Sequence, residues 1–196
     1  MVGIQSESPP VVIGVTGASG APIAVRALRA LHDAHVPVAL VVSSGAVPVL
    51  REECGIGPDA LAPFARDVYS DGDFTSPIAS GSRRTRAMAI VPCSSNTLAK
   101  VAVGISDTLI TRAAQVHVKE RRPLVVVPRE TPLSAIALRH MTTLAELGVV
   151  VLPASGAYYT HPRSVEDITD FLAGRLLDHL GVADHHLYRG WREGGP

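Results

Sequence analysis

The residues best suited to chemistry lie in short polar stretches that follow runs of Val, Ile and Leu. The first stretch, Thr-Gly-Ala-Ser-Gly at residues 16–20, precedes a segment with helical periodicity. A glycine turn there offers backbone N–H groups and a helix N-terminus to a phosphate or a flavin edge, although a plain tight turn is the alternative. The stretch lacks the third glycine of a dinucleotide loop. Because Ser43 and Ser44 stand where a dinucleotide enzyme carries its ribose-binding acid, a mononucleotide is favoured over NAD.

A second polar stretch, Pro-Cys-Ser-Ser-Asn-Thr at residues 92–97, repeats this arrangement after another apolar run. Its Ser and Asn side chains would cap the following helix, and capping alone is a sufficient reason for their presence. Loops after parallel strands nonetheless meet at one edge of the sheet, where open sheets bind ligands. We therefore expect the two stretches to line one crevice.

The elements that must position these loops follow the alternating pattern of a parallel sheet covered by helices. Short β-branched runs predict buried strands, and apolar residues at helical spacing predict the helices between them. The predicted strands are residues 11–15, 36–42, 87–91, 124–127 and 149–152, and the predicted helices are 22–34, 45–53, 97–103, 109–120, 133–147 and 165–180.

Length and composition predict a single domain that associates with further copies of itself. A chain of 196 residues, 46% hydrophobic and 18% charged, can build a sizeable core and leaves apolar surface to bury between subunits. Residues 55–86, rich in Gly, Pro, Ser and Asp, predict a functional loop or linker with at most one strand near 67–69. We expect residues 1–10 to be disordered or extended, 11–182 to form the domain and 183–196 to form a docking arm.

Charge and cysteine content argue against several classes of function. The formal net charge is zero and no long basic run is present, which argues against a nucleic-acid partner. Cys54 and Cys93 have neither disulfide nor zinc-site spacing, so a reduced cytoplasm is the expected setting. The eight histidines form no ligand set, and no apolar run approaches the roughly 18 residues of a membrane span. We expect neither a bound metal nor a membrane.

Several motifs together resemble the flavin prenyltransferase (UbiX) family. They are the stretches at 16–20 and 92–94, Ala-Ser-Gly-Ser at 79–82, Tyr159, and above all Lys-Glu-Arg-Arg-Pro-Leu at 119–124 with Pro-Arg-Glu-Thr-Pro-Leu at 128–133. The resemblance covers residues 11–181. It implies a Rossmann-like (flavodoxin-like) α/β fold, an open parallel sheet with helices on both faces in three α/β/α layers, assembled as a homododecamer.

The resemblance also implies an activity and a set of site residues. Such enzymes join the dimethylallyl group of dimethylallyl phosphate to N5 and C6 of reduced FMN, and the prenylated FMN serves a UbiD-type decarboxylase. Glu130 would be the acid/base residue, Ser19 would lie by the flavin and Glu53 would be a second candidate. The residues implied for FMN are Gly17, Ala18, Ser19, Ser43, Ser80, Ser94, Thr97 and Arg112, and those implied for the prenyl phosphate are Lys119, Arg129, Tyr159 and Arg175.

These residue types suit the implied reaction. Breaking an allylic C–O bond leaves a phosphate, which fixed Lys and Arg donors stabilise, and an allyl cation, which aromatic rings can face. A Glu next to an Arg can pass a proton to the phosphate and later accept one. Alternatively, residues 119–122 form a solvated helix end that complements the helix dipole, which we favour for Arg121 and Arg122. Arg175 could instead form a salt bridge between subunits.

The sequence departs from the family pattern at three positions, and two other functions remain as alternatives. Gln115 replaces an Asp, Arg83 a Phe and Thr108 an Asn, which puts the shape of the prenyl pocket in question. A flavin-dependent cysteine decarboxylase is the first alternative, but helix 45–53 has no His, and Pro-Arg-Glu-Thr at 128–131 replaces its substrate loop. The second is an FMN-binding or delivery protein without prenyl transfer, against which the phosphate-ligand set argues.

Overall fold

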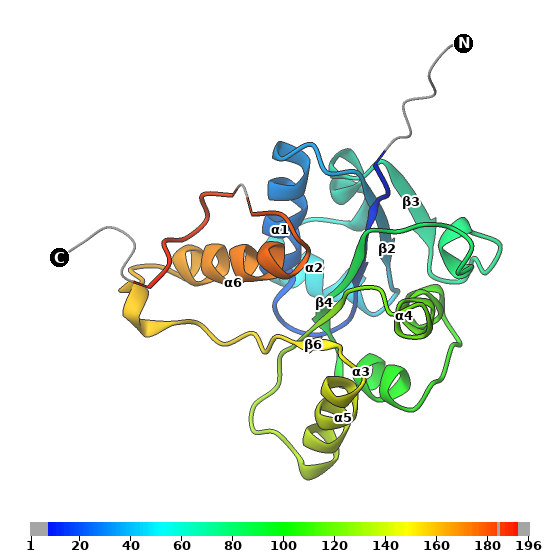
Figure 1. The fold of residues 1–196 in the computed structure, drawn as a ribbon. Coiled ribbons are helices and arrows are strands. Elements are labelled where there is room, and N and C mark those ends of the chain that lie inside the picture. The colour runs from blue at the N-terminus through cyan, green and yellow to red at the C-terminus, as the bar shows by residue number, and fades with distance from the viewer. Residues whose placement is uncertain (1–7, 184, 192–196) are drawn as a thin grey trace.

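The fold is built on one six-stranded parallel sheet. The computed structural model describes residues 8–183 and 185–191. The strand order is β3-β2-β1-β4-β5-β6, and all five pairings are parallel (Figure 1). The strands are β1 (Val11–Val15), β2 (Val38–Val42), β3 (Asp67–Ser70), β4 (Ala87–Cys93), β5 (Leu124–Pro128) and β6 (Val150–Val151). Strands β1, β4 and β5 are buried along their whole length, as expected for a sheet covered on both faces.

Helices cover both faces of this sheet and give it three layers. Ile13 and Val15 of β1 belong to one core with α1 and α6, whereas Val12 belongs to a second core with α3 and α4. In Figure 1, α1 and α6 lie on one side of the sheet and α3 and α4 on the other. The alternation follows from the period of two along a strand. The helices are α1 (Ala21–Asp33), α2 (Ala46–Cys54), α3 (Ser95–Ala102), α4 (Leu109–Lys119), α5 (Ala135–Glu146) and α6 (Val165–His179). The predicted α/β fold class is confirmed.

Capping residues explain where the helices begin. Helix α3 starts at Ser95 rather than residue 97, because the Ser94 hydroxyl accepts a hydrogen bond from the Thr97 N–H. Helix α5 starts at Ala135 rather than residue 133, because Ser134 is the cap. The segment predicted to be irregular contains β3 and two short 3₁₀-helices, η1 (Pro58–Phe64) and η2 (Pro77–Ala79), and a third, η3 (Tyr158–Thr160), precedes α6.

The last described residues fold back onto α1 and α6. Leu187 and Tyr188 pack against the core that these two helices share. A Cβ added at Gly174 would lie 2.5 Å from the Tyr188 ring, so the arm fits a groove that the glycine leaves open. Of the predicted N-terminal segment, only residues 8–10 are described, and residues 184 and 192–196 of the predicted arm lie outside the described part of the chain.

The sheet topology creates a crevice between β1 and β4. The chain leaves these neighbouring strands toward opposite faces, into α1 and α3, and such switch points are where open parallel sheets bind ligands. The loop after β1 also touches the loop after β2, because a Cβ at Gly17 would lie 2.6 Å from the Gly45 carbonyl oxygen. Only glycine permits this approach.

Candidate active site

A hollow of about 420 Å³ opens at this switch point. Hydroxyl and amide groups dominate its lining, which draws on the loops after four strands. We call it the switch-point hollow; it is lined by Thr16, Gly17, Ser43, Ser44, Gly45, Asp71, Ser94, Asn96, Thr97, Lys100, Thr108, Ile110 and Thr111. Four residues implied for FMN, namely Gly17, Ser43, Ser94 and Thr97, meet here.

Thr16 ties the two predicted polar stretches together. Its hydroxyl donates to the Pro92 carbonyl at 2.7 Å and accepts from the Ser94 N–H at 2.8 Å, and the residue is only 2% exposed. Ser94 in turn caps α3. The second polar stretch therefore caps α3, and it also meets the first stretch at one crevice.

Two helix N-termini face the hollow without a negative charge. Gly45 is the N-cap of α2 and Ser94 the N-cap of α3, and neither helix has an acidic residue in its first turn. Unpaired N–H groups and the positive end of the helix dipole favour an anion at such a place. The hollow therefore suits a phosphate group surrounded by hydroxyl donors.

The sequence analysis did not identify Asp71 and Lys100 as part of this hollow. The Asp71 carboxylate accepts from the Ile110 N–H at 2.9 Å and so occupies the N-terminus of α4. Lys100 lies 2.7 Å from the Asp107 carboxylate and supplies a cation at the hollow. A lysine six residues after a helix cap that follows a strand was an available signal for this position.

The N-terminus of α1 differs from the sequence expectation. Its Gly20 and Ala21 N–H groups, expected to bind a ligand anion, instead donate to Glu53 Oε2, each at 2.9 Å. Partial burial raises the pKa of Glu53, but hydrogen bonds from Ser19, Gly20 and Ala21 and the charge of Arg129 outweigh it and leave that pKa lowered. The chain thus provides its own carboxylate at the N-terminus of α1.

Arg129 and Glu130 follow β5 at the same edge of the sheet. Both are exposed, and the Glu130 carboxylate accepts from the Thr131 N–H at 3.1 Å. The charge of Arg129 reaches Glu53, so Ser19, Glu53 and Arg129 form one group beside α1.

Arg112, Ser80 and Lys119 lie along a different surface, where the loop after η2 runs beside α4. Arg112 Nε donates to the Ala79 carbonyl at 2.9 Å, and Arg112 is not among the residues that line the switch-point hollow. Lys119 pairs with Glu120 next to Gly81. Lys119 ends α4 just before β5 begins, and Arg129 directly follows β5. The two residues therefore lie at opposite ends of the strands.

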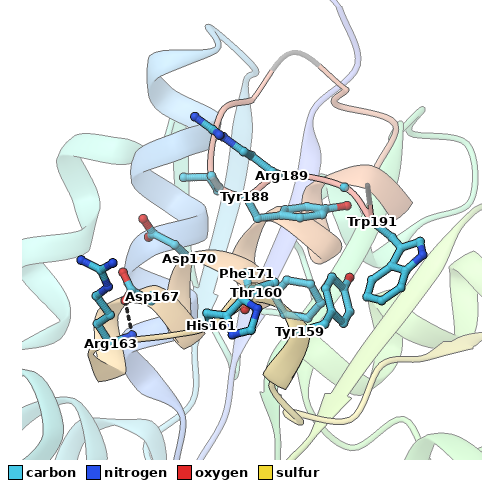
Figure 2. Close-up of a pocket in the computed structure, with 12 residues that line it drawn as sticks. Tyr159, Thr160, His161, Arg163, Asp167, Asp170, Phe171, Tyr188, Arg189 and Trp191 are labelled. Carbon is cyan, nitrogen blue, oxygen red and sulfur yellow. Dashed lines mark hydrogen bonds between the residues drawn. The ribbon is translucent and has the colours of Figure 1, made fainter. Parts of the chain in front are cut away.

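Tyr159 lies in a second, larger hollow of about 1000 Å³ between η3, α6 and the C-terminal arm (Figure 2). We call it the arm hollow. The Tyr159 ring meets Phe171 and Trp191 edge to face, with centroids 6.3 Å and 4.9 Å away. Arg175 lies one helical turn beyond Phe171 and binds Asp178 and Tyr188. A single chain thus does not bring the four implied phosphate ligands together.

The departures from the family pattern have structural roles. The Gln115 amide donates to the Val101 carbonyl at 2.7 Å and joins α4 to α3. Thr108 caps α4 through a reciprocal pair of hydrogen bonds with Thr111.

The interpretation of Arg122 as a solvated helix end is wrong, because its guanidinium donates to the carbonyls of Gly81 at 2.6 Å and Arg83 at 2.8 Å.

Two further features bear on the class of site. Residues 8–183 and 185–191 contain no group of three or more His, Cys, Asp or Glu side chains arranged to hold a metal. Within the same ranges, no helix has the length and apolar character needed to cross a membrane.

Known proteins resemble this chain over nearly its whole length. A family model described as Flavoprotein matches residues 3–177. Flavin prenyltransferase UbiX of Thermoplasma acidophilum is 49% identical over 181 residues, covering 91% of this chain and 98% of the relative. The same enzyme of Deinococcus radiodurans is 45% identical, with 96% of both chains covered.

Solved structures agree with the sequence relatives. A crystal structure of AnUbiX (PadA1) with FMN and dimethylallyl pyrophosphate has a TM-score of 0.88 at 39% identity, covering 93% of this chain and 98% of that one. A dodecameric FMN-dependent UbiX-like decarboxylase from Escherichia coli O157:H7 gives 0.90 at 40% identity over the same shares. A PPC decarboxylase mutant gives 0.63 at 23% identity, covering 76% of this chain and 83% of that one, and shares the fold.

Proposed function

The chain belongs to the flavin prenyltransferase (UbiX) family of flavoproteins, and on that premise we infer that it joins a dimethylallyl group to N5 and C6 of reduced FMN. Dimethylallyl phosphate is the donor, FMN is the flavin and prenylated FMN is the product. The structural observation that carries this inference is the switch-point hollow. Its hydroxyl lining and its two uncharged helix N-termini suit a mononucleotide phosphate.

Residues of the switch-point hollow would hold the FMN phosphate. Ser43, Ser94 and Thr97 can donate hydroxyl hydrogens, and Gly17 lets the backbone approach closely. Ala18 and Ser19 continue this loop toward the isoalloxazine, while Ser80 and Arg112 would contribute from the separate surface beside α4. Lys100 adds a positive charge that the motif comparison did not include.

Cations and one carboxyl group would carry the chemistry on the prenyl phosphate. Arg129 would bind the leaving phosphate, and the adjacent Glu130 would donate a proton to it and later accept the proton released from the flavin ring. Glu53, the second candidate, is engaged at the N-terminus of α1 and would mainly hold Ser19 and the loop in place.

The positions of Lys119 and Arg129 support a site shared between subunits. They lie at opposite ends of β5, whose five residues rise about 3.3 Å each, so one phosphate cannot contact both within one chain. A second subunit can supply Lys119. Exposed apolar side chains on α5, including Ile136 at 63% and Leu138 at 48% exposure, support the same conclusion. The assembly would be a homo-oligomer, and a dodecamer is the size found for the Escherichia coli UbiX-like relative.

The product would pass to a UbiD-type decarboxylase in the cytoplasm. Prenylated FMN is useful only to an enzyme that binds it as a cofactor, so a recipient enzyme is required. The free thiols of Cys54 and Cys93 support a reducing compartment.

One paired assay distinguishes this function from the two alternatives. The chain is incubated anaerobically with reduced FMN and dimethylallyl phosphate, and separately with oxidised FMN and a cysteine-terminated peptide or pantothenoyl cysteine. We expect a new flavin in the first reaction and no carbon dioxide in the second. Carbon dioxide from the second reaction would identify a cysteine decarboxylase, whose solved relatives share only the fold with this chain at 19–23% identity. Bound but unmodified FMN would identify a delivery protein.

A further inference from the structure

Asp178 of α6 joins the C-terminal arm to Arg175. Its Oδ2 accepts from Arg175 Nη1 at 2.8 Å and from the Tyr188 hydroxyl at 2.5 Å, and its Oδ1 contacts His185 Nε2 at 2.8 Å. The Tyr188 hydroxyl also accepts from Arg175 Nη1 at 3.1 Å. One carboxylate therefore connects two arm side chains to one helix arginine.

Close packing fixes this cluster in one arrangement. The Tyr188 ring lies against Gly174, where a Cβ would be only 2.5 Å away, and meets Phe171 edge to face with centroids 5.2 Å apart. The His185 side chain is only 7% exposed. The hydroxyl of Tyr188 thus has a defined position, and it orients Arg175 through the shared carboxylate.

One edge of the Arg175 guanidinium is left unused by this cluster. Both contacts use Nη1, and within the described part of the chain Nε and Nη2 have no hydrogen bond. Two parallel N–H groups on one side of a guanidinium match two oxygens of a phosphate. Arg175 lies one turn from Phe171, which lines the arm hollow together with Tyr159 and Tyr188 (Figure 2).

We propose that Tyr188 and Asp178 are positioning residues that hold Arg175 with its Nε and Nη2 edge presented to the phosphate of the prenyl donor. The arm is then part of the substrate site and does more than stabilise the fold. The proposal rests on the proposed function, because it needs a phosphorylated prenyl donor at Arg175. It extends that function by assigning a task to a C-terminal segment outside the family motifs that identified the site.

The chain provides its own reporter of the arm. Trp191 is its single tryptophan, and it lies on the arm beside Tyr159. Dimethylallyl phosphate is added to the enzyme loaded with oxidised FMN, so that binding is observed without turnover, and Trp191 fluorescence is followed. We expect a saturable change for the wild type.

Tyr188→Phe is the critical variant, because it keeps the ring against Gly174 and removes only the hydroxyl. We expect its half-saturating concentration of dimethylallyl phosphate to rise about 5- to 10-fold, the scale of one lost hydrogen bond. Tyr158→Phe, at a tyrosine that is 88% exposed, is the matched control and should respond like the wild type. Equal affinity for Tyr188→Phe and the wild type, or no Trp191 response in the wild type, would overturn the proposal.

Steady-state kinetics separate positioning from a general loss of structure. Tyr188→Phe and Asp178→Asn should raise KM for dimethylallyl phosphate while kcat and KM for reduced FMN stay within about twofold of the wild type. A fall in kcat with an unchanged prenyl-donor KM would contradict the proposal. A wild type that binds the donor but forms no prenylated flavin would instead refute the proposed function and leave the positioning role standing.

Discussion

At the scale of single residues, the chain places carboxylates of its own at the N-termini of some helices and none at those of α2 and α3. Glu53 occupies the N-terminus of α1 and Asp71 that of α4, whereas α2 and α3 begin at Gly45 and Ser94. The N-termini of α2 and α3 attract an anionic ligand, whereas Asp71, which also lines the switch-point hollow, already accepts from the N-terminus of α4. This distribution of charge favours a phosphate between the loops after β1, β2 and β4, as the proposed function requires.

Replacing Gly17 tests the geometry of this hollow. Gly17→Ala would place a Cβ 2.6 Å from the Gly45 carbonyl oxygen, so one of the two loops must move. We expect the free energy of unfolding to fall by about 1–3 kcal/mol, as in other overpacked sites, and FMN affinity to fall with it. Gly57→Ala is the control, because a Cβ there meets no atom within 4 Å. Calorimetry and FMN titration measure both effects, and normal FMN affinity in Gly17→Ala would argue against the switch-point hollow as the flavin site.

Glu130→Gln tests the assignment of the acid/base group. The amide keeps the size and the hydrogen-bond acceptor of the carboxylate but cannot exchange a proton. Prenylated FMN should form about 10²–10⁴-fold more slowly, with FMN affinity little changed, since general acid/base groups contribute on that scale. The rate is measured by quenching the reaction at intervals and quantifying prenylated FMN. A rate equal to that of the wild type would make Glu53 the candidate acid/base residue.

At the scale of elements, the sequence predicted the sheet and its helices because the strands are buried runs and the helices have caps and apolar stripes. Strand β1 matches its predicted bounds, and helix starts shifted where Ser94 and Ser134 act as caps. What could not be predicted depends on contacts between distant segments. The approach of Glu53 to Gly20, 33 residues away in the sequence, is not encoded in local spacing.

Acidification tests how Glu53 holds the N-terminus of α1. Because the pKa of Glu53 is lowered in the folded chain, its contribution is complete above the ordinary pKa of a glutamate and is lost as pH falls through the lowered pKa. At neutral pH, Glu53→Gln should lower the free energy of unfolding by about 0.5–1 kcal/mol. The difference in free energy of unfolding between Glu53→Gln and the wild type, measured by urea titration, should become smaller at acidic pH. A destabilisation by Glu53→Gln that stays constant from neutral to acidic pH would rule out the charge effect.

At the scale of the whole molecule, the arrangement is incomplete in one chain. The hollow at the switch point, the arm hollow and Lys119 lie on separate parts of the surface. Association can bring them together without any change in the sheet. On the proposed function, oligomerisation would complete the active site and would cover exposed apolar side chains such as Ile136.

Light scattering of the purified chain tests this requirement. We expect a particle several times the mass of one chain at micromolar concentration, because a site that needs Lys119 and Arg129 on one phosphate needs two subunits. Lys119→Ala should raise KM for dimethylallyl phosphate without dissociating the particle. A monomer that prenylates FMN at full rate would contradict the shared site.

Truncation after Ala183 tests the arm as a separable unit. Among the described residues of the arm, Leu187 and Tyr188 pack against the core as partly buried side chains, so we expect the sheet to fold without them and still bind FMN. Assembly or binding of the prenyl donor should weaken instead. Circular dichroism and FMN titration give the answer, and loss of the helical spectrum would show that the arm is part of the core.

The mass of the flavin released from the enzyme shows directly whether the chain prenylates reduced FMN. The chain is incubated anaerobically with reduced FMN and dimethylallyl phosphate, denatured, and its flavin is analysed by mass spectrometry beside a sample without the prenyl donor. We expect the flavin to gain one five-carbon prenyl unit only when the donor is present. Recovery of unmodified FMN from both samples would contradict the proposed function.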